Sequence, residues 1–503
     1  MFGSNRKAAL IILGFILIVV FYLVTRLANI TLLPVFVDEA IYIRWSQVMK
    51  NEPTLRFLPQ SDGKPPLFMW LMMPVFKFIS DPLFAGRFVS ILAGLGTLLT
   101  IFVTSLVIFS SPVLALLAGA AYVINPFATF FDRQALADSL LAFFGLMTLF
   151  VGLLLVRKPR FDLGFVLGFI LGGALLTKPP AMLFILSLPV LLLTLPKKRP
   201  GRYWLTLGAS VLLALVISQV FYNILRLGPN FHLINSRNYD YVFPLSEVLR
   251  HPLNPLQGNL YKTLTWLANF YTLPLLLLAP FSLLSSKKRL VITLWLWLLS
   301  PLIAQSLVAK VYTTRYFLFI VPTLCLLSAI GLEQLYRRLR PVSFLAAAWV
   351  LISCLWYLNF YYNDPAKMPM PQQMAHGYFQ EWTAGDGIKE IAALLKVQAG
   401  SHQVLVGTEG FFGTLPDGLQ MYTDQTPHLT IIGVGQPIVL IPQSLTNSLV
   451  DNDVYLVVNR SRNQLPESEL VKMELLQEYV KSPRPDGTRE ALQFYHLKPR
   501  ITP

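Results

Sequence analysis

The chain has 503 residues, of which 54% are hydrophobic and only 13% are charged, and its formal net charge is +15. A soluble protein carries about 25% charged residues, so this composition excludes a mainly soluble chain and places most of it in the membrane class. The positive charge does not indicate a nucleic-acid partner, because no basic stripe is interleaved with aromatic residues in a soluble segment.

The sequence predicts a polytopic α-helical membrane protein. A transmembrane helix needs about 20 mostly apolar residues, and about eleven such stretches occur, at 8–25, 84–109, 112–126, 138–156, 162–177, 180–196, 203–226, 263–284, 290–309, 315–335 and 342–362. The first follows Arg6 and Lys7, as the core of a signal peptide would. No small-residue cleavage site follows it, so we predict that it is retained as a span.

Short basic clusters lie between these predicted spans, namely RKPR (157–160), KKRPGR (197–202), SSKKR (285–289) and YRRLRP (336–341). With eleven spans, all of them fall on one side of the membrane together with the amino terminus. The positive-inside rule assigns that side to the cytoplasm. We therefore expect residues 25–83, the loop 227–262 and everything after residue 362 on the outer face.

The chain after the last span is expected to be water-soluble. Residues 363–386 are polar and rich in proline, which predicts a linker between a membrane domain (1–362) and a small extracytoplasmic α/β domain (387–503). The predicted elements of this domain are helices at 387–398 and 467–481 and strands at 402–408, 429–434, 453–460 and 491–497. The glycines of GTEGFFG (407–413) lack GxGxxG spacing, so they predict no nucleotide site.

Two adjacent acids, Asp38 and Glu39, follow the first span in the stretch VFVDEAIYIRW. In one interpretation, Asp38 caps a short interfacial helix and Glu39 stands in its first turn. In the other, the carboxylates form a catalytic or metal site, because a positioned carboxylate can take a proton from an attacking hydroxyl. The two interpretations do not exclude each other.

The stretch SDGKPPLFMWLMM (61–73) predicts an apolar segment that lies along the membrane and is entered through a rigid Pro-Pro pair. Lys64 before this segment is either a snorkelling anchor or a partner of a lipid phosphate. In the outer loop, FHLINSRNYDYVF (231–243) interleaves aromatic residues with Arg237 and Asn238. This pattern suits a sugar or acceptor surface, and interfacial anchoring by the aromatics is the alternative.

Six segments occur in the order seen in membrane glycosyltransferases of the GT-C type. They are the Asp-Glu pair, KPPL, AGRFVSILAGLGTLL (85–99), FDRQALADSLLAFF (131–144), LLTKPPAML (175–183) and TTRYFLFIVP (313–322). Over about residues 5–360 the chain resembles the protein O-mannosyltransferase and undecaprenyl-phosphate aminoarabinose transferase group. The resemblance implies an inverting enzyme of the plasma (inner) membrane. Its donor would be a polyprenyl-phosphate sugar, its acceptor an unidentified protein, lipid or glycan, and transfer would occur at the outer face.

The resemblance also implies roles for three acids. Asp38 is expected to be the general base that activates the acceptor hydroxyl, with Glu39 shaping the site beside it. Asp138 matches an acid in the second outer loop of the family and is expected to orient the catalytic groups. The alternative for Asp138 is a cap of the fourth span.

The expected phosphate contacts are cations, because charge builds up on the departing phosphate. Lys64 and Arg315 match family positions near that phosphate, and Arg87 and Arg133 at outer span ends are further candidates. The alternative for each arginine is a snorkelling side chain at a span end. Lys178, before a second Pro-Pro pair, is either a charged break between two spans or a further carrier contact.

A metal ion is not supported by the ligand spacing. Relatives in the aminoarabinose group commonly carry an acid directly before the KPP lysine, and here that position is Gly63. His232 and His251 lie in the loop 227–262 with no paired metal-ligand spacing. The cofactor therefore stays unassigned, with a divalent cation as an open alternative.

A polytopic transporter or flippase for a lipid-linked or polar substrate is the alternative function. Such proteins place ionisable groups near the bilayer midplane, whereas the charges here gather at the expected outer ends of spans. An inactive scaffold with the same fold is a third alternative, which the joint presence of Asp38, Lys64 and Arg315 disfavours.

Overall fold

The computed structural model describes residues 2–195 and 199–498, and for residues 2–7 only the backbone. Residues 196–198, which belong to a predicted span and to the cluster KKRPGR, and the last five residues of the predicted C-terminal domain lie outside the described residues. The chain forms two compact units. The first unit is Met1–Ile30, Leu55–Leu71 and Arg87–Pro369, and the second is Thr31–Thr54, Met72–Gly86 and Met370–Pro503.

The described residues contain eight helical segments that are long and apolar enough to cross a membrane, at Ala8–Leu27, Pro82–Ile108, Ala137–Arg157, Gly201–Leu227, Leu253–Leu284, Lys288–Val308, Thr314–Arg338 and Arg340–Asn363. A bent pair, Pro112–Ile124 with Pro126–Asp132, makes a ninth, and two predicted spans correspond to the shorter segments Phe161–Thr177 and Pro179–Thr194. The predicted polytopic helical fold is therefore confirmed, and about eleven spans is close to this count.

The helices wholly within the first unit are α1 (Phe2–Leu27), α5 (Pro112–Ile124), α6 (Pro126–Asp132), α7 (Ala137–Arg157), α8 (Phe161–Thr177), α9 (Met182–Ser187), α10 (Gly201–Asn223), α11 (Phe231–Tyr241), α12 (Leu245–Arg250), α13 (Leu253–Trp266), α14 (Leu273–Leu278), α15 (Lys288–Val308), α16 (Val321–Arg338) and α17 (Arg340–Asn363). Two more, α3 (Leu67–Met72) and α4 (Pro82–Val103), begin or end in the second unit. The predicted loop 227–262 is therefore mostly helical, since α11, α12 and the start of α13 occupy it.

The break between α5 and α6 follows from the sequence Asn125-Pro126. Proline has no N–H to continue a helix and disfavours a helical residue before it, and Asn125 is extended at φ −64° and ψ 121°. The Asn125 side chain accepts a hydrogen bond from the Ala128 N–H at 2.9 Å, which caps α6. The predicted span 112–126 therefore ends at Ile124, and α6 turns away at 65°.

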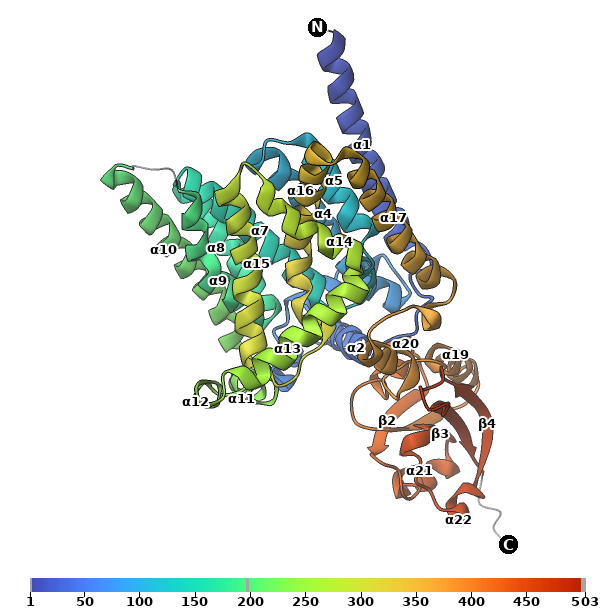
Figure 1. Ribbon diagram of the computed structural model, residues 1–503. Helices are drawn as coiled ribbons and strands as arrows, with labels where there is room; N and C mark the ends of the chain where they lie inside the picture. Colours follow the sequence, from blue (N-terminus) through green and yellow to red (C-terminus); the bar gives the residue numbers. More distant parts are fainter. Residues whose placement is uncertain (1, 196–198, 499–503) are drawn as a thin grey trace. The chain divides into compact units, whose positions relative to one another are not determined.

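Helices α8 and α10 lie side by side because glycines line their contact (Figure 1). A Cβ atom added to Gly164 would lie 2.5 Å from the Ser210 carbonyl oxygen, and one added to Gly168 would lie 2.7 Å from Cβ of Ile217. Small residues spaced by four allow this close approach in membrane helices. The packing fixes the end of α8, and Lys178 follows it directly.

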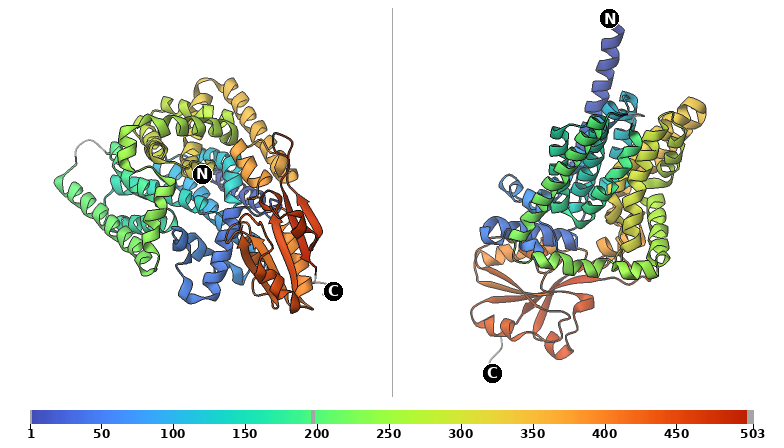
Figure 2. Two further views of the ribbon diagram at one scale, coloured as in Figure 1. Left: turned by 90° about the horizontal axis from the view of Figure 1, so that it is seen from below. Right: turned by 90° about the vertical axis from the view of Figure 1, so that its left-hand side faces the viewer.

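The outer surface of the helix bundle is apolar. Leu10 on α1, Leu205 on α10 and Leu345 on α17 are exposed by 61%, 75% and 72%. Many such side chains in contact with water would be costly, whereas lipid accommodates them at no cost. This surface is that of a multi-pass membrane protein, and Figure 2 shows the bundle from two further sides.

Three of the basic clusters gather at one end of this bundle. Arg157 at the end of α7 donates to the Ile108 carbonyl at 2.8 Å, and Lys287 donates to the carbonyl of Phe109, the next residue. Arg338 at the end of α16 donates to the carbonyl of Leu284, the residue just before the cluster that contains Lys287. The position of these three clusters at one end of the bundle agrees with the predicted alternation of the spans across the membrane.

The second unit contains a five-stranded sheet of order β2-β1-β3-β5-β4. Its strands are β1 (Val404–Glu409), β2 (Leu429–Gly435), β3 (Asp453–Asn459), β4 (Met473–Val480) and β5 (Ala491–Leu497). Strand β1 runs parallel to β2 and β3, whereas β5 is antiparallel to β3 and β4. The helices of this unit are α2 (Val37–Asn51), α18 (Gln372–Ala375), α19 (Ile388–Ala399), α20 (Asp417–Tyr422), α21 (Gln443–Asn447) and α22 (Glu467–Leu470).

The predicted helix at 467–481 is wrong. Only Glu467–Leu470 is helical, and Met473–Val480 forms the edge strand β4, with Met473 opposite Leu497 and Val480 opposite Ala491. The local sequence is rich in Glu, Leu, Lys and Met, which favour a helix. Pairing with β5 determines the conformation of this segment. The hydrogen bonds between the two strands outweigh a difference in helix propensity of a few tenths of a kcal/mol per residue.

Candidate functional site

The two adjacent acids stand in the first turn of α2. The helix begins at Val37 with Phe36 as its N-cap. Glu39 is fully buried, and its Oε2 accepts a hydrogen bond from the Phe36 N–H at 3.0 Å. The interpretation of Asp38 as the helix cap is therefore wrong, because the helix begins one residue too early and Glu39 makes the capping contact. Asp38 is the second helical residue and is half-buried.

Backbone contacts of the second unit fix the start of α2. Phe36 forms a bridge with Ala384, and the Val37 N–H donates to the Thr383 carbonyl at 3.1 Å. Further along the helix, Arg44 forms an ion pair with Asp424. The residue before Asp38 is therefore held directly, which limits the positions that its carboxylate can take.

In the first unit, Lys64 belongs to a charged cluster with Asp62 and Arg237. The Lys64 Nζ atom lies 3.0 Å from Oδ2 of Asp62, and the Arg237 Nε donates to Oδ1 at 3.1 Å. Arg237 comes from α11, in the stretch whose aromatic and polar pattern suits a sugar or acceptor surface. Arg237 also forms an ion pair with Asp240 at 3.0 Å, so the cluster holds two cations and two carboxylates.

The backbone geometry at position 63 explains why this chain has Gly63 before the lysine and not an acid. Its φ is +67°, which favours glycine, and a Cβ atom would lie 2.6 Å from Cβ of Arg237 and 2.9 Å from the Leu233 carbonyl oxygen. A side chain at this position would displace α11. Among the described residues, no group of three or more His, Cys, Asp or Glu side chains is placed to hold a metal ion.

A second cluster joins Asp138, Lys178 and Arg315 around Tyr316. The Lys178 Nζ atom lies 2.6 Å from Oδ1 of Asp138 and 4.9 Å from the centroid of the Tyr316 ring. The Arg315 guanidinium lies 5.6 Å from the centroid of the same ring. Asp138 is buried and stands second in α7, whose N-cap is Leu136, so its interpretation as a cap is wrong. This cluster brings two cations together with a buried carboxylate.

The two Lys-Pro-Pro segments share one apolar core. Leu67 and Trp70, just after the first segment, pack against a core of Leu176, Leu225 and Ile234, and Leu176 stands just before the second segment. The segments that contain Lys64 and Lys178 therefore meet at the same small hydrophobic cluster, which sequence spacing alone did not predict.

Arg87 and Arg133 are fully buried, so the snorkelling interpretation is wrong for both. Arg87 donates to the Ile30 carbonyl at 2.6 Å. Arg133 donates to the carbonyls of Thr25 and Asn29 at 2.7 and 3.0 Å, and its guanidinium lies 4.6 Å from the centroid of the Tyr361 ring. Buried guanidinium groups need such acceptors. These contacts connect the end of α1 and the residues after it to α4, which contains Arg87, and to Arg133 at the end of α6.

Sequence reasoning missed a buried network around Asp132. The Arg26 Nε lies 3.6 Å from Oδ2 of Asp132, and the Tyr122 hydroxyl donates to the same oxygen at 3.0 Å. Tyr22 donates to it at 3.4 Å. The sequence offered one indication of this network, the charge of Arg26 at the end of an apolar span. Only the turn into α6 places Asp132 beside Arg26.

A comparison with known protein families finds a match for part of the chain. Residues 63–222 match the family model of dolichyl-phosphate-mannose-protein mannosyltransferases. None of the curated proteins is a significant sequence match.

Solved structures show the fold. The crystal structure of ArnT from Cupriavidus metallidurans bound to undecaprenyl phosphate has a TM-score of 0.62 and 16% identity, and the match covers 96% of this chain and 98% of that chain. The apo state of the same protein has a TM-score of 0.58 and 16% identity, with 97% and 98% covered. An oligosaccharyltransferase from Archaeoglobus fulgidus has a TM-score of 0.48 and 11% identity, with 97% and 74% covered.

The fold and the family match thus confirm the resemblance seen in the sequence and favour a glycosyltransferase over a transporter. The matched region contains both Lys-Pro-Pro segments and Asp138. Residues 63–222 thus match the dolichyl-phosphate-mannose-protein mannosyltransferases, and the fold of the chain is similar to that of ArnT.

Proposed function

We propose that this enzyme transfers a sugar from a polyprenyl-phosphate carrier to an acceptor at the outer face of the plasma (inner) membrane, with inversion at the anomeric carbon. The observation that carries the proposal is the pair of cation-containing clusters, Lys64 with Arg237 and Lys178 with Arg315, whose lysines come from segments that share one apolar core. The undecaprenyl phosphate bound by ArnT supports a carrier of this class.

The cations would act on the leaving group. Each cluster offers two cations, and a departing polyprenyl phosphate gains negative charge as its bond to the sugar breaks. Cations fixed in advance stabilise that charge without reorganisation during the reaction. Lys64 and Arg315 are the proposed direct contacts. Lys178 is a further candidate, positioned by Asp138.

Asp38 is the proposed general base. An inverting transfer occurs in one displacement, so the acceptor hydroxyl must lose its proton as it attacks, and a carboxylate within hydrogen-bond reach can accept it. Glu39 accepts a backbone hydrogen bond at the start of α2. The proposal therefore gives the chemistry to Asp38 and leaves Glu39 to hold the helix start on which Asp38 stands.

Arg87 and Arg133 stay proposed contributors to phosphate binding. Both are buried and hydrogen-bonded to backbone carbonyls. We propose that their charge raises the local positive potential, while their hydrogen bonds hold the segment after α1 in place.

The outer-face location is supported by helix α7. Asp138 stands at its start, whereas Arg157 stands at its end, among the gathered basic clusters. The 21 residues of α7 span roughly 30 Å at 1.5 Å per residue, which is the thickness of a bilayer core. With the basic end in the cytoplasm, the Asp138 cluster belongs to the outer face, and we expect the sheet of the second unit to be extracytoplasmic.

The test is a donor assay on the purified full-length enzyme in lipid nanodiscs. A panel of undecaprenyl-phosphate sugars is supplied with a membrane-lipid extract as the acceptor source, and mass spectrometry follows the release of undecaprenyl phosphate. We expect release from at least one donor, dependent on the acceptor source. Release from no donor, while the enzyme binds undecaprenyl phosphate, would refute sugar transfer but not carrier binding.

A further inference from the structure

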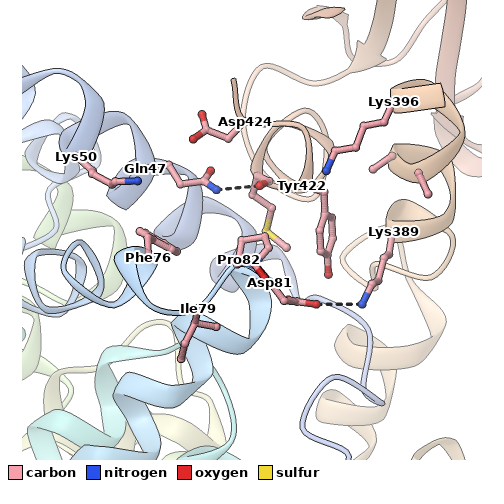
Figure 3. A pocket seen from close by; sticks show the side chains of 14 residues that line it. Gln47, Lys50, Phe76, Ile79, Asp81, Pro82, Lys389, Lys396, Tyr422 and Asp424 are labelled. Carbon is pink, nitrogen blue, oxygen red and sulfur yellow. Dashed lines mark hydrogen bonds and ion pairs between the residues drawn. The ribbon is translucent and has the colours of Figure 1, made fainter. Parts of the chain in front are cut away.

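The second unit contains a cavity that the proposed sugar transfer does not use. Its volume is about 510 Å³, and it is lined by α2, by residues 76–82 and by helices α19 and α20 (Figure 3). Cavities of a few hundred cubic ångströms hold small-molecule ligands in many proteins. All of the lining residues belong to the second unit.

The charge of this cavity is positive. Lys50, Lys389 and Lys396 line it together with Asp81 and Asp424. Both acids are already engaged: Asp81 lies 3.1 Å from the Lys389 Nζ and also accepts from the backbone N–H of Leu83, and Asp424 accepts from Arg44 at 2.7 Å. Among the described residues, no acid forms an ion pair with Lys50 or Lys396. These two ammonium groups are available for an anion.

Gln47 adds an unused acceptor. Its side chain is 94% buried, since only 6% is exposed, and its Nε2 donates to the Met421 carbonyl at 2.8 Å. That contact fixes the amide orientation, because the oxygen would repel the carbonyl. Its Oε1 is buried and has no hydrogen-bond partner among the described residues. A buried acceptor without a donor is costly, so a ligand hydroxyl that donates to it would be stabilised.

Apolar side chains line another part of the wall. Phe76, Ile79 and Tyr422 line the same cavity. A ligand that fits must combine an anionic end with a hydrogen-bond donor, and an apolar portion can lie against these side chains. A phosphate satisfies two lysines, since Lys binds phosphate as a compact point charge. A hydroxyl close to the phosphate satisfies the Gln47 oxygen.

We propose that this cavity binds a phosphate group that carries a neighbouring hydroxyl, with Lys50 and Lys396 on the phosphate and Gln47 Oε1 accepting from the hydroxyl. The source is either a soluble polyol phosphate or the headgroup of a phosphatidylglycerol-type lipid. The inference does not rest on the proposed sugar transfer. Lys50 stands twelve residues after Asp38 on the same helix, which is about 18 Å along its axis.

The test measures binding to the full-length protein in detergent at low ionic strength by isothermal titration calorimetry. Glycerol 3-phosphate probes the soluble source, and dihexanoyl phosphatidylglycerol with dihexanoyl phosphatidylcholine as its neutral counterpart probes the lipid source. The variant Lys50→Gln/Lys396→Gln removes both cations. Lys472→Gln is the matched control, because Lys472 is an exposed lysine of the same unit, paired with Glu469 and outside the cavity.

We expect the double variant to bind the effective probe at least about 10-fold more weakly, since each lysine contributes a charge-assisted contact to the phosphate, while the control binds normally. Binding of glycerol 3-phosphate assigns the soluble source. Binding of the phosphatidylglycerol alone, in preference to the phosphatidylcholine, assigns the lipid source. No binding of either phosphate, or equal binding by the double variant, would overturn the proposal.

Propyl phosphate tests the hydroxyl, because it has the same charge as glycerol 3-phosphate and no hydroxyl groups. We expect it to bind about 2–10-fold more weakly, the effect of one hydrogen bond. Equal affinity for the two phosphates would remove Gln47 from the site. The melting temperatures of all variants show whether the second unit is intact.

Discussion

The Nζ atom of Lys178 lies 2.6 Å from Oδ1 of Asp138, although 40 residues separate them in the chain. The two meet because α7 and α8 pack against each other as an antiparallel pair, which brings the start of one beside the end of the other. The Asp138 side chain is 4% exposed and that of Lys178 is 18% exposed. The lysine thus neutralises a carboxylate that is almost out of contact with water.

We predict that Lys178→Ala destabilises the first unit by roughly 2–4 kcal/mol, because it leaves the buried Asp138 without its partner. The double variant Asp138→Asn/Lys178→Gln should recover most of that loss, since two neutral side chains keep a hydrogen bond and remove the unpaired charge. Thermal unfolding in a fixed detergent measures both. A Lys178→Ala protein with the melting temperature of the wild type would contradict the stabilising role of the buried ion pair.

The second prediction separates Asp38 from Glu39. Asp38→Asn keeps the size of the side chain but removes the proton acceptor, so turnover should fall by roughly 100-fold or more while the fold is retained. Glu39→Ala removes the contact to the Phe36 N–H and should destabilise the start of α2 by about 0.5–2 kcal/mol. Glu39→Gln can still accept that hydrogen bond and serves as the control.

Initial rates of carrier release and melting temperatures together test these assignments. A folded Asp38→Asn enzyme that transfers sugar at the wild-type rate would end the proposed role of Asp38. A loss of turnover in Glu39→Gln without a loss of stability would show that the roles are exchanged.

The third prediction concerns the carrier phosphate. Lys64→Ala and Arg315→Ala should each weaken binding of undecaprenyl phosphate by about 1.5–3 kcal/mol, the contribution of a charge-assisted hydrogen bond. Lys367→Ala is the matched control in the same unit, because Lys367 is 75% exposed and pairs only with Asp364 among the acids described. Binding can be followed by native mass spectrometry, and unchanged affinity in both test variants would refute the assignment.

The fourth prediction uses Asp417 in α20, outside the membrane spans. Burial raises the pKa of this carboxyl to about 6, although the N–H of Gly413 donates to it. The unfolded chain has the ordinary pKa near 3.9, so between about pH 4 and 6 the folded state binds more protons. Stability from this group is therefore fully present below about pH 4 and is lost as the pH rises through 6.

Asp417→Asn should remove this pH dependence, because the amide oxygen still accepts from Gly413 and cannot titrate. The difference in unfolding free energy, variant minus wild type, should rise by on the order of 2 kcal/mol between pH 4 and 7. Chemical denaturation at several pH values measures it. A difference that stays constant with pH would contradict the raised pKa.

The fifth prediction tests the topology. Reporter fusions at residues 200, 288 and 380 should place the first two positions in the cytoplasm and the third outside, as the gathered basic clusters require. A cytoplasmic signal at 380 would contradict the proposed outer-face transfer, whatever the activity assay shows.

The sequence by itself determined the features that depend on local composition. Hydropathy over about 20 residues predicts the spans, since each helix satisfies its own backbone and needs only an apolar surface. The basic clusters predict how the spans alternate across the membrane. The order of short motifs around Asp38, Lys64 and Arg315 indicated the enzyme class. Strands β1, β2, β3 and β5 followed from short apolar runs between turn residues.

Only the tertiary structure decided the contacts between distant segments. The pairing of Lys178 with Asp138 depends on the packing of α7 and α8, and the burial of Asp132 beside Arg26 depends on the bend at Asn125. Strand β4 exists because β5 offers it a ladder of hydrogen bonds, against its local helix propensity. In each case the deciding energy lies between residues far apart in the chain, where local sequence patterns carry no information.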